Sequence, residues 1–390
     1  MLTDLASALA AGGADVHVVT SRQRYDDPAA SLPAQEVIDG VAVHRVRTSA
    51  FGRGNLLGRS FDYLSFYFSA AIALFRLVRA GDIVVAKTDP PLISVPVGWV
   101  ARIRRARQVN WLQDLFPEIA TELGVKLAQG RFGRLLAWWR DRSLKVASRN
   151  VVLSHSMQDR LAARITEAKT IVVIQNWADG SALRPIRPDL NPLRAEWGLE
   201  DKFVVGYSGN MGRAHEFQTI IDAAVALREQ RDIVFLFIGG GAQQARLAEV
   251  AAQRQINALF KPYQPRAMLA QSLGVADVHL VSLRPALEGL VVPSKFYGIT
   301  AVGRPAIFIG DKEGDIGKII GTATCGFTVR EGDLAGLIDA IRTLRDDSAL
   351  CARMGCNARR VFDESFDKAI AIDKWRRLLD EVARGEGALR

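Results

Sequence analysis

The stretch Val204-Val205-Gly206-Tyr207-Ser208-Gly209-Asn210-Met211-Gly212-Arg213-Ala214-His215 decides the fold. It is an apolar run that ends in closely spaced glycines, and we expect a helix from about Phe217. A strand that leads through a glycine-rich turn into a helix is typical of doubly wound α/β sheets, whose ligands gather beyond the carboxyl ends of the strands. Glycines there let backbone N–H groups approach a phosphate, although a tight turn without a ligand explains them equally well.

Strand-length apolar runs alternate with longer helical runs on both sides of this stretch, which is the pattern of parallel α/β sheets. Upstream, the expected strands are 15–20, 41–46, 83–87, 108–112, 150–153 and 171–174, and the expected helices are 61–79, 91–102 and 131–148. Downstream, the expected strands are 203–208, 233–238, 258–260, 278–283, 306–309 and 326–329. We therefore predict two αβ domains, at 1–178 and 201–364, joined by a proline-containing connection at 179–200.

A final amphipathic helix is expected over 367–384, within a terminal segment 365–385. Its apolar face would carry Ala369, Ile372, Trp375, Leu378, Leu379 and Val382.

The composition is that of a globular protein with room for two cores, because 49% of its 390 residues are hydrophobic. The net charge of +9 favours anionic partners such as phosphates or acidic lipids, or else reflects a solvated basic surface. Three cysteines without paired spacing argue against a disulfide or zinc framework. The apolar run 63–75 is too short to span a bilayer and no signal peptide is visible, so we expect a cytoplasmic location.

A second motif, Glu288-Gly289-Leu290-Val291-Val292-Pro293-Ser294-Lys295-Phe296-Tyr297-Gly298, points to a ligand. It combines an acidic residue, a Pro-Ser turn that opens a helix, and a Lys in the first turn. A helix start presents unpaired N–H groups that favour phosphate, and Lys295 adds positive charge. Because Gly239-Gly240-Gly241 ends the next strand at the same sheet edge, the three segments together predict a nucleotide-sugar site.

The chain resembles the retaining glycosyltransferases of family 4, which have the GT-B fold, and among them the bacterial surface-polysaccharide branch of fucosaminyl- and colanic-acid-type transferases. The resemblance rests on the residues 114–117, 176–177, 206–213, 238–241, 292–298 and 301–305. It implies two Rossmann-like domains with parallel sheets facing an interdomain cleft. It also implies that the second domain holds the sugar nucleotide, and that the final helix crosses back to the first domain.

The resemblance places Arg213 and Lys295 on the donor diphosphate, where their charge would stabilise the leaving group without a metal ion. Glu288 is similar to the first acid of the family's paired-glutamate motif, or is a surface acid on a loop. Gly298 stands where many relatives carry the second Glu, so ribose recognition must differ here or use the backbone. The donor-binding residues that the resemblance implies are Gly209, Asn210, Gly212, Arg213, Gly240, Glu288, Pro293, Ser294, Lys295 and Tyr297.

In the first domain, Asp114 resembles the Asp of the branch's Asp-Leu-aromatic-Pro motif and is the candidate catalytic residue there. It follows a strand-like run, so it should lie on a loop at a carboxyl end. The alternative is a helix cap over the segment after Pro117.

A membrane contact is expected on the first domain. Residues 99–150 contain eleven basic and four acidic residues, and Trp138 and Trp139 lie among them. Six aromatic residues also crowd 61–75. These features favour peripheral attachment to the anionic inner leaflet of the plasma membrane, with burial of the aromatics in the domain core as the alternative.

One departure from the family concerns the first strand. The family's first domain begins with a buried strand and a Gly-rich loop ahead of the helix that corresponds to 4–11, whereas this chain starts within that helix. The central strand therefore looks absent, which would leave two strand edges unpaired in the middle of a sheet. We expect lower stability than for a chain extended upstream, and doubtful activity.

The sequence thus predicts transfer of a hexose, an amino or deoxy sugar, from a UDP-linked donor to a lipid-linked saccharide, without cofactor or metal. A nucleotide-sugar epimerase of the same fold is the alternative, as is a non-catalytic binding protein, which the absent strand and Gly298 favour. Nucleic acid is not an expected partner, because no recognised binding module is present.

Overall fold

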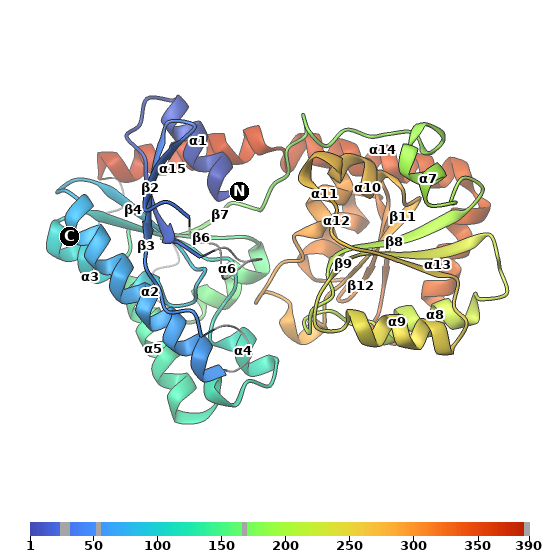
Figure 1. The fold of residues 1–390 in the computed structure, drawn as a ribbon, viewed down its shortest axis with the longest axis horizontal. Coiled ribbons are helices and arrows are strands. Elements are labelled where there is room, and N and C mark those ends of the chain that lie inside the picture. The colour runs from blue at the N-terminus through green and yellow to red at the C-terminus, as the bar shows by residue number, and fades with distance from the viewer. Residues whose placement is uncertain (24–31, 52–55, 166–169, 386–390) are drawn as a thin grey trace. The chain divides into compact units, whose positions relative to one another are not determined.

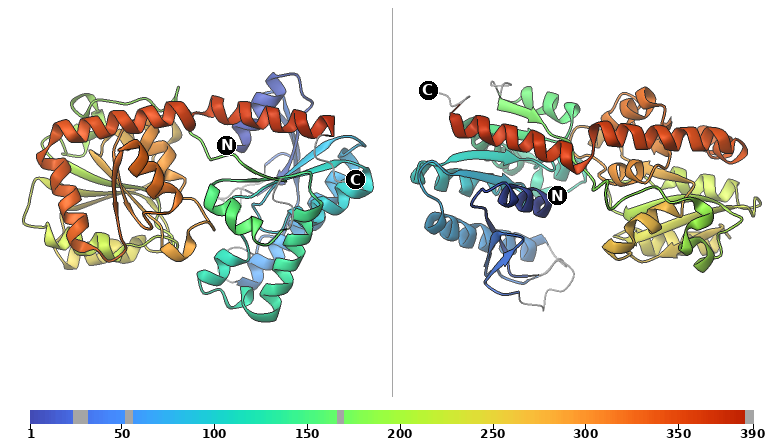
Figure 2. Two further views of the ribbon diagram at one scale, coloured as in Figure 1. Left: turned by 180° about the vertical axis from the view of Figure 1, so that it is seen from behind. Right: turned by 90° about the horizontal axis from the view of Figure 1, so that it is seen from above.

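The computed structural model describes residues 1–23, 32–51, 56–165 and 170–385. The chain forms two compact units, of which the first comprises Met1–Ile174 with Ile372–Arg390 and the second Gln175–Ala371. Each unit has parallel strands with helices packed on them (Figures 1 and 2). The predicted α/β architecture of two domains with parallel sheets is confirmed.

The second unit is built on a six-stranded sheet in the order β10-β9-β8-β11-β12-β13, in which every pair is parallel. Its strands are β8 (Phe203–Asn210), β9 (Ile233–Gly240), β10 (Ala258–Lys261), β11 (Val278–Ser282), β12 (Ala306–Ile309) and β13 (Gly326–Val329). Strand β8 lies inside the sheet and pairs with β9 over its whole length. Sequence analysis found all six strands, but placed the ends of β8 and β9 two residues too early.

Helices cover both faces of this sheet (Figure 1). They are α7 (Pro192–Glu196), α8 (Gln218–Ala226), α9 (Gln244–Gln253), α10 (Leu269–Gly274), α11 (Lys295–Ala301), α12 (Asp315–Ala323), α13 (Leu334–Asp346) and α14 (Ser348–Ser365), with the short turns η3 (Pro188–Leu190), η4 (Arg266–Met268) and η5 (Pro285–Leu287). Buried side chains of α8, α9 and α13 form one core with β8 and β9, around Ile220, Leu247 and Leu337.

The strands of the first unit form two sheets. A four-stranded parallel sheet has the order β4 (Ile83–Lys87), β5 (Arg107–Trp111), β6 (Arg149–Val152) and β7 (Ile171–Val173). A three-stranded sheet has the order β1 (His17–Ser21), β3 (Val41–Val46) and β2 (Gln35–Ile38). Strand β2 is antiparallel to β3 and exposed along its length, so it lacks the apolar pattern by which sequence analysis finds strands.

The two sheets of the first unit share a core although no described strand is hydrogen-bonded to both of them. Val19 of β1 and Val84 of β4 pack against the same apolar cluster, which contains Ala70 and Val97. These last two residues belong to helices α2 (Leu56–Leu77) and α3 (Ser94–Arg104), which therefore cover the junction. Strands β1 and β4 therefore each lie at the edge of a sheet among the described strands.

The other helices of the first unit are α1 (Leu2–Ala11), α4 (Glu118–Glu122), the turn η1 (Lys126–Ala128), α5 (Gly130–Val146) and α6 (His155–Ala162). Helix α15 (Lys368–Arg384) begins in the second unit, and its residues from Ile372 onward belong to the first. Trp375 packs against Trp111 of β5, with ring centroids 4.9 Å apart and the rings tilted by 59°, as expected of the apolar face. Ala369 is exposed, contrary to the prediction, and Ala371 is buried in its place, because the helix turns a different face inward at its start.

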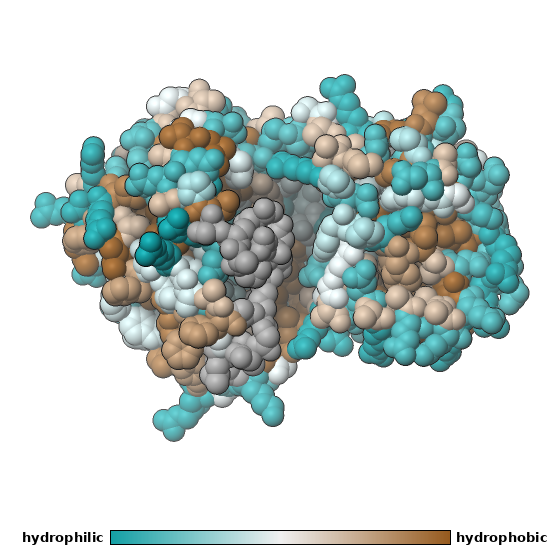
Figure 3. All heavy atoms as spheres, in the orientation of Figure 1, coloured by the Kyte–Doolittle hydropathy of each residue, from teal (hydrophilic) through white to brown (hydrophobic). Residues whose placement is uncertain are grey.

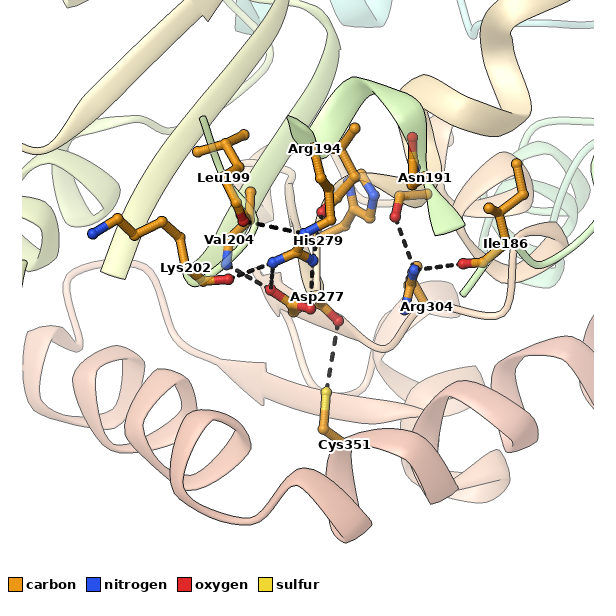
Figure 4. Close-up of polar contacts among 12 residues, drawn as sticks. Ile186, Asn191, Arg194, Leu199, Lys202, Val204, Asp277, His279, Arg304 and Cys351 are labelled. Carbon is orange, nitrogen blue, oxygen red and sulfur yellow. Dashed lines mark hydrogen bonds and ion pairs between the residues drawn. The ribbon is translucent and has the colours of Figure 1, made fainter. Parts of the chain in front are cut away.

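The expected connection at 179–200 belongs to the second unit and packs onto its sheet. Figure 4 shows why. Buried Arg194 forms an ion pair of 2.9 Å with Asp277, whose carboxylate also accepts from the Val204 N–H at 2.7 Å. Arg304 donates to the Ile186 carbonyl at 2.9 Å, so this motif residue holds the segment in place.

The three cysteines differ in exposure. Cys325 is buried, Cys351 is half-buried and donates to the Asp277 carbonyl at 3.6 Å, and Cys356 is exposed. Burial raises the pKa of the Cys325 and Cys351 thiols to about 11.

Candidate functional site

Strands β8 and β9 remain paired up to their last residues, just before the loops that follow them. Glycines at these carboxyl ends make the close pairing possible. Gly209 pairs with Gly239, and their φ angles are +128° and +131°. A Cβ atom at Gly239 would lie 2.2 Å from the Gly209 carbonyl oxygen. Only glycine fits at this position, because other residues are strained at such φ values and would collide with backbone.

The two loops that follow are tied to each other. The Met211 N–H donates to the Gly240 carbonyl at 2.7 Å, and the Gln243 side-chain amide donates to the Gly212 carbonyl at 2.7 Å. A Cβ atom at Gly241 would lie 2.4 Å from the Asn210 side-chain oxygen, so the loops also pack closely. The predicted glycine turn is thus a rigid double loop at the end of the sheet, where ligands bind in this class of fold.

Lys295 is the first residue of α11, and its side chain lies over the end of β8. Its ammonium donates to the Tyr207 hydroxyl and lies 3.6 Å from the centroid of the Tyr207 ring. Its Cε lies 3.6 Å from the place of a Cβ at Gly209, so the cation adjoins the glycine loop. Sequence analysis missed Tyr207, although an aromatic residue two positions before the loop was a signal for it.

The Lys295 ammonium has no carboxylate partner in the part of the chain that the structure describes. Burial lowers its pKa to about 7. The Tyr207 hydroxyl donates onward to the Asn210 carbonyl at 3.0 Å, so it can only accept from Lys295. A half-buried cation held by a neutral acceptor is suited to bind an anion, because the anion would supply the missing charge.

His215 lies on the same side of the sheet and is neutral at physiological pH. Burial, followed by the positive charge of Lys295, lowers its pKa to about 4. Its Nδ1 lies 2.6 Å from the Ser282 carbonyl at the end of β11, so Nδ1 carries the proton and donates it. Neutral His215 therefore joins the β8 loop to the neighbouring strand β11, and the positive charge beside it is that of Lys295.

The helix start that the sequence predicted is smaller than expected. Helix α11 has seven residues, and Ser294 makes no side-chain cap. A helix of that length contributes a weak dipole, so the ammonium of Lys295 is the main source of positive potential here. Ser294 is exposed, whereas Pro293 and Tyr297 are buried.

The other predicted donor residues hold different positions. Arg213 is exposed on the β8 loop and forms no ion pair within the described residues, so its convergence with Lys295 stays a prediction. Tyr297 packs against Phe366 with centroids 5.0 Å apart. A Cβ at Gly298 would lie 3.3 Å from Leu273, so this position faces the interior of the unit.

Glu288 is half-buried and caps a helix. Its Oε1 accepts from the Asp315 N–H at 2.8 Å, at the start of α12. Burial raises its pKa to about 7, and the neighbouring carboxylates of Asp315 and Asp311 add to the shift. The structure thus gives Glu288 a local capping contact, and its contact with a donor stays a prediction.

In the first unit, Asp114 lies on the loop after β5 and remains exposed at its surface. Desolvation of the carboxyl group by surrounding protein atoms raises its pKa to about 6, and the negative charge of Asp89 adds a smaller contribution. Asp89 follows β4 and lies 3.8 Å from the Lys87 ammonium. The alternative role as a cap is wrong, because α4 begins after Pro117 and has no side-chain cap.

Sequence analysis also missed Tyr263, which follows β10 and has 61% of its surface exposed. Its ring lies 3.3 Å from the place of a Cβ at Gly240. Strand β10 lies two places from β8 in the sheet, and adjacent strands are about 4.8 Å apart, so the end of β10 that leads to Tyr263 is roughly two strand spacings from the end of β8 near Lys295. An exposed aromatic between Pro262 and Pro265 was the available signal.

Two general features bear on the chemistry. The described residues contain no group of three or more His, Cys, Asp or Glu side chains placed to hold a metal ion. No helix in the described ranges has the length and apolar character to cross a bilayer.

Comparison with known proteins agrees with this geometry. Residues 1–177 match the glycosyl transferase 4-like domain, and residues 191–361 match glycosyl transferases group 1. The two halves of this chain carry the two domains of a family 4-type glycosyltransferase. The family expected from the sequence is thereby confirmed at this level.

Two curated relatives share 29% identity with this glycosyltransferase. The probable glycosyltransferase WbjE of Pseudomonas aeruginosa matches over 83% of the chain and 80% of its own length. The putative colanic acid biosynthesis glycosyl transferase WcaI of Escherichia coli K12 matches over 72% of the chain and 69% of its own length.

Solved structures agree in fold. Sucrose-phosphate synthase from Thermosynechococcus elongatus has a TM-score of 0.78 at 17% identity, with 99% of this chain and 93% of that chain covered. HepE of Anabaena, solved with UDP and glucose, has a TM-score of 0.68 at 18% identity, with 87% and 86% covered.

Proposed function

We propose that this glycosyltransferase moves a hexosyl group, an amino or deoxy sugar, from a UDP-linked donor to a lipid-linked saccharide in the synthesis of a bacterial surface polysaccharide. The observation that carries the proposal is the ammonium of half-buried Lys295, which lacks a carboxylate partner in the described chain and adjoins the glycine loop. The names of WbjE and WcaI support the reaction class, and WcaI supports the polysaccharide. The presence of UDP and glucose in HepE supports the donor.

The reaction would proceed with retention, by displacement on the face from which the diphosphate leaves. As the bond between the sugar and the diphosphate breaks, negative charge develops on the diphosphate oxygen. Lys295 would stabilise that charge from the end of β8, and Arg213 would assist from the β8 loop. We propose that these cations act without a metal ion, so transfer should persist in EDTA.

Tyr263 would hold the nucleobase. With the diphosphate at Lys295, we place the nucleoside along the ends of β9 and β10, because the exposed ring of Tyr263 offers a stacking surface there. Gly240 lies between the two, where a side chain would block the path. Asp114 is the proposed contribution of the first unit to catalysis, and we place the enzyme on the cytoplasmic face of the membrane.

Thermal-shift measurements with UDP, GDP and their sugars test the donor part of this proposal, because a ligand of the native state raises the melting temperature. We expect UDP and a UDP-sugar to raise it. Incubation of the responding sugar nucleotide with lipid-linked saccharides then tests transfer, and NMR of the product reports its anomeric configuration. Release of free sugar or an epimer without any acceptor would favour the epimerase alternative instead.

A further inference from the structure

An extensive apolar surface lies on three helices of the first unit. We call it the outer helix face; its residues are Phe61, Leu64, Phe68, Ile72 and Phe75 on α2, Trp99 and Ile103 on α3, and Phe132, Leu135, Trp138 and Val146 on α5. Among them Phe68, Ile103 and Trp99 expose 71%, 66% and 62% of their surfaces. Single exposed apolar residues are ordinary, but a contiguous group of this size marks an interaction surface.

Helix α2 is apolar on two opposite sides. Its exposed residues recur every three or four positions from Phe61 to Phe75, which places them on one stripe. Phe66, Ala70 and Leu74 form the other stripe and pack into the core beneath. The expectation that these aromatics are domain core therefore holds for Phe66 and is wrong for Phe68.

Side-chain contacts join the three stripes into one surface. The Arg104 guanidinium of α3 lies 5.2 Å above the Phe75 ring of α2. Trp99 of α3 lies 6.0 Å from Trp139 of α5, between ring centroids. Figure 3 shows hydrophobic side chains gathered over the part of the first unit where Figure 1 places α2 and α3.

The charge of these helices is strongly positive. Helices α2, α3 and α5 contain nine Lys or Arg residues and two Asp residues. Asp62 accepts from the Ser49 hydroxyl at 2.7 Å, and Asp141 accepts from Arg140 at 2.6 Å, so both are engaged within the unit. Exposed cations such as Arg102, Arg134 and Lys145 border the apolar residues.

We propose that the outer helix face is the surface by which this enzyme docks on an anionic lipid bilayer. Aromatic and aliphatic side chains would enter the headgroup region while the bordering cations bind acidic headgroups, and an aromatic surface bordered by Arg and Lys suits this role. A second copy of the chain fits less well, because pairing two such faces would bring like charges together. The role of this surface rests on the proposed function, because docking would bring the enzyme to its lipid-linked acceptor. The surface itself is inferred only from the exposed apolar and basic residues named above.

Vesicle flotation tests the surface. The full chain is floated with phosphatidylcholine vesicles, with and without phosphatidylglycerol, at low and high salt. We expect flotation with the anionic vesicles that weakens as salt rises. The variant Phe68→Glu/Trp99→Glu should bind at least about tenfold more weakly, because two large apolar groups no longer enter the bilayer. Val37→Glu changes a residue that is 72% exposed on β2, outside the face, and should bind as the wild type does.

A second pair of variants tests the cations. Arg131→Gln/Arg134→Gln/Lys145→Gln should lose the preference for anionic vesicles, whereas Arg246→Gln/Arg254→Gln/Lys318→Gln, which removes the same charge from the second unit, should keep it. Every residue changed in these two apolar and two basic variants is exposed, so we expect the circular dichroism spectra and melting temperatures of all four variants to match those of the wild type.

Three results would overturn the docking surface. They are a wild-type chain that never floats with anionic vesicles, undiminished flotation of Phe68→Glu/Trp99→Glu, and a wild-type dimer that this variant makes monomeric while vesicles remain unbound. The UDP thermal shift of each variant separates this inference from the proposed function. Normal flotation without any response to nucleotides would reject the donor proposal alone.

Discussion

The sheet of the second unit continues through six strands, whereas the strands of the first unit divide into sheets of three and four. Strand β8 is paired on both sides and ends in the glycine loops beside Lys295. Strands β1 and β4 are each paired on one side among the described strands. A residue at the end of a doubly paired strand is fixed by its neighbours, so we expect precise donor geometry in one unit and easier local opening in the other.

The largest expected effect is that of removing the Lys295 ammonium from the second unit, which should abolish donor binding. Lys295→Met should remove the UDP-induced thermal shift and lower transfer by about 10²–10³-fold, because the developing charge on the diphosphate loses its cationic partner. Transfer assays and thermal shifts measure the two effects. The melting temperature without ligand should be retained.

Two comparisons accompany this variant. Lys318→Met removes an exposed lysine of α12 and should leave both properties intact. Asp114→Asn, in the first unit, should lower transfer while the UDP shift persists. If Asp114→Asn lost UDP binding, or if Lys295→Met retained it, donor binding could not be assigned to the second unit alone.

Amide hydrogen exchange measures whether the strands of the first unit open more easily than those of the second. Amides of β4 should exchange at least about tenfold faster than those of β8, because one edge of β4 lacks a strand partner among the described residues. Strand β5, paired on both sides within the first unit, is the matched control. Equal protection of β4 and β5 in a mass-spectrometric exchange experiment would contradict the interpretation.

Glycine substitutions test how tightly the second unit fixes its loops. Gly239→Ala should destabilise the protein by roughly 1–3 kcal/mol, because it combines positive φ with a backbone collision. Gly321→Ala in α12 has open space around its Cβ position and should stabilise the helix by up to about 1 kcal/mol. Melting curves measure both, and a neutral Gly239→Ala would show that the paired loops can relax.

Loss of the Tyr263 ring should have a smaller effect on donor binding. Tyr263→Ala should weaken UDP binding by about 1 kcal/mol or more, as removal of a stacking platform does, and Tyr263→Phe should bind normally. Leu190→Ala, at a residue that is 67% exposed in the same unit, is the control. Calorimetry with unchanged affinity for Tyr263→Ala would place the base elsewhere.

The last expected effect concerns pH. The free Lys295 has a pKa of about 7, and only its ammonium attracts a diphosphate, so UDP-glucose binding should weaken by up to about tenfold per pH unit above that value. The donor's diphosphate diester does not titrate near neutrality, so the change reports the protein. In Lys295→Arg the dependence should vanish. A flat profile for the wild type would show that Lys295 stays charged without the donor.

Sequence reasoning located the strands of the second unit because each is a buried apolar run between glycines or helices. It missed β2, because the residues of this strand are all exposed and lack the apolar pattern of a buried strand. Lys295 was found through its motif. The Tyr207 hydroxyl beneath it was missed because that contact joins residues 88 positions apart.

The thiols described above give this enzyme a natural position for a reporter dye. Alkylation requires the thiolate, and the raised pKa values of Cys325 and Cys351 keep those groups protonated at neutral pH. Cys356 is the exposed cysteine of the chain and lies on α14. A maleimide fluorophore should therefore label the native protein at one site without any engineered mutation, and its anisotropy could follow vesicle capture in real time.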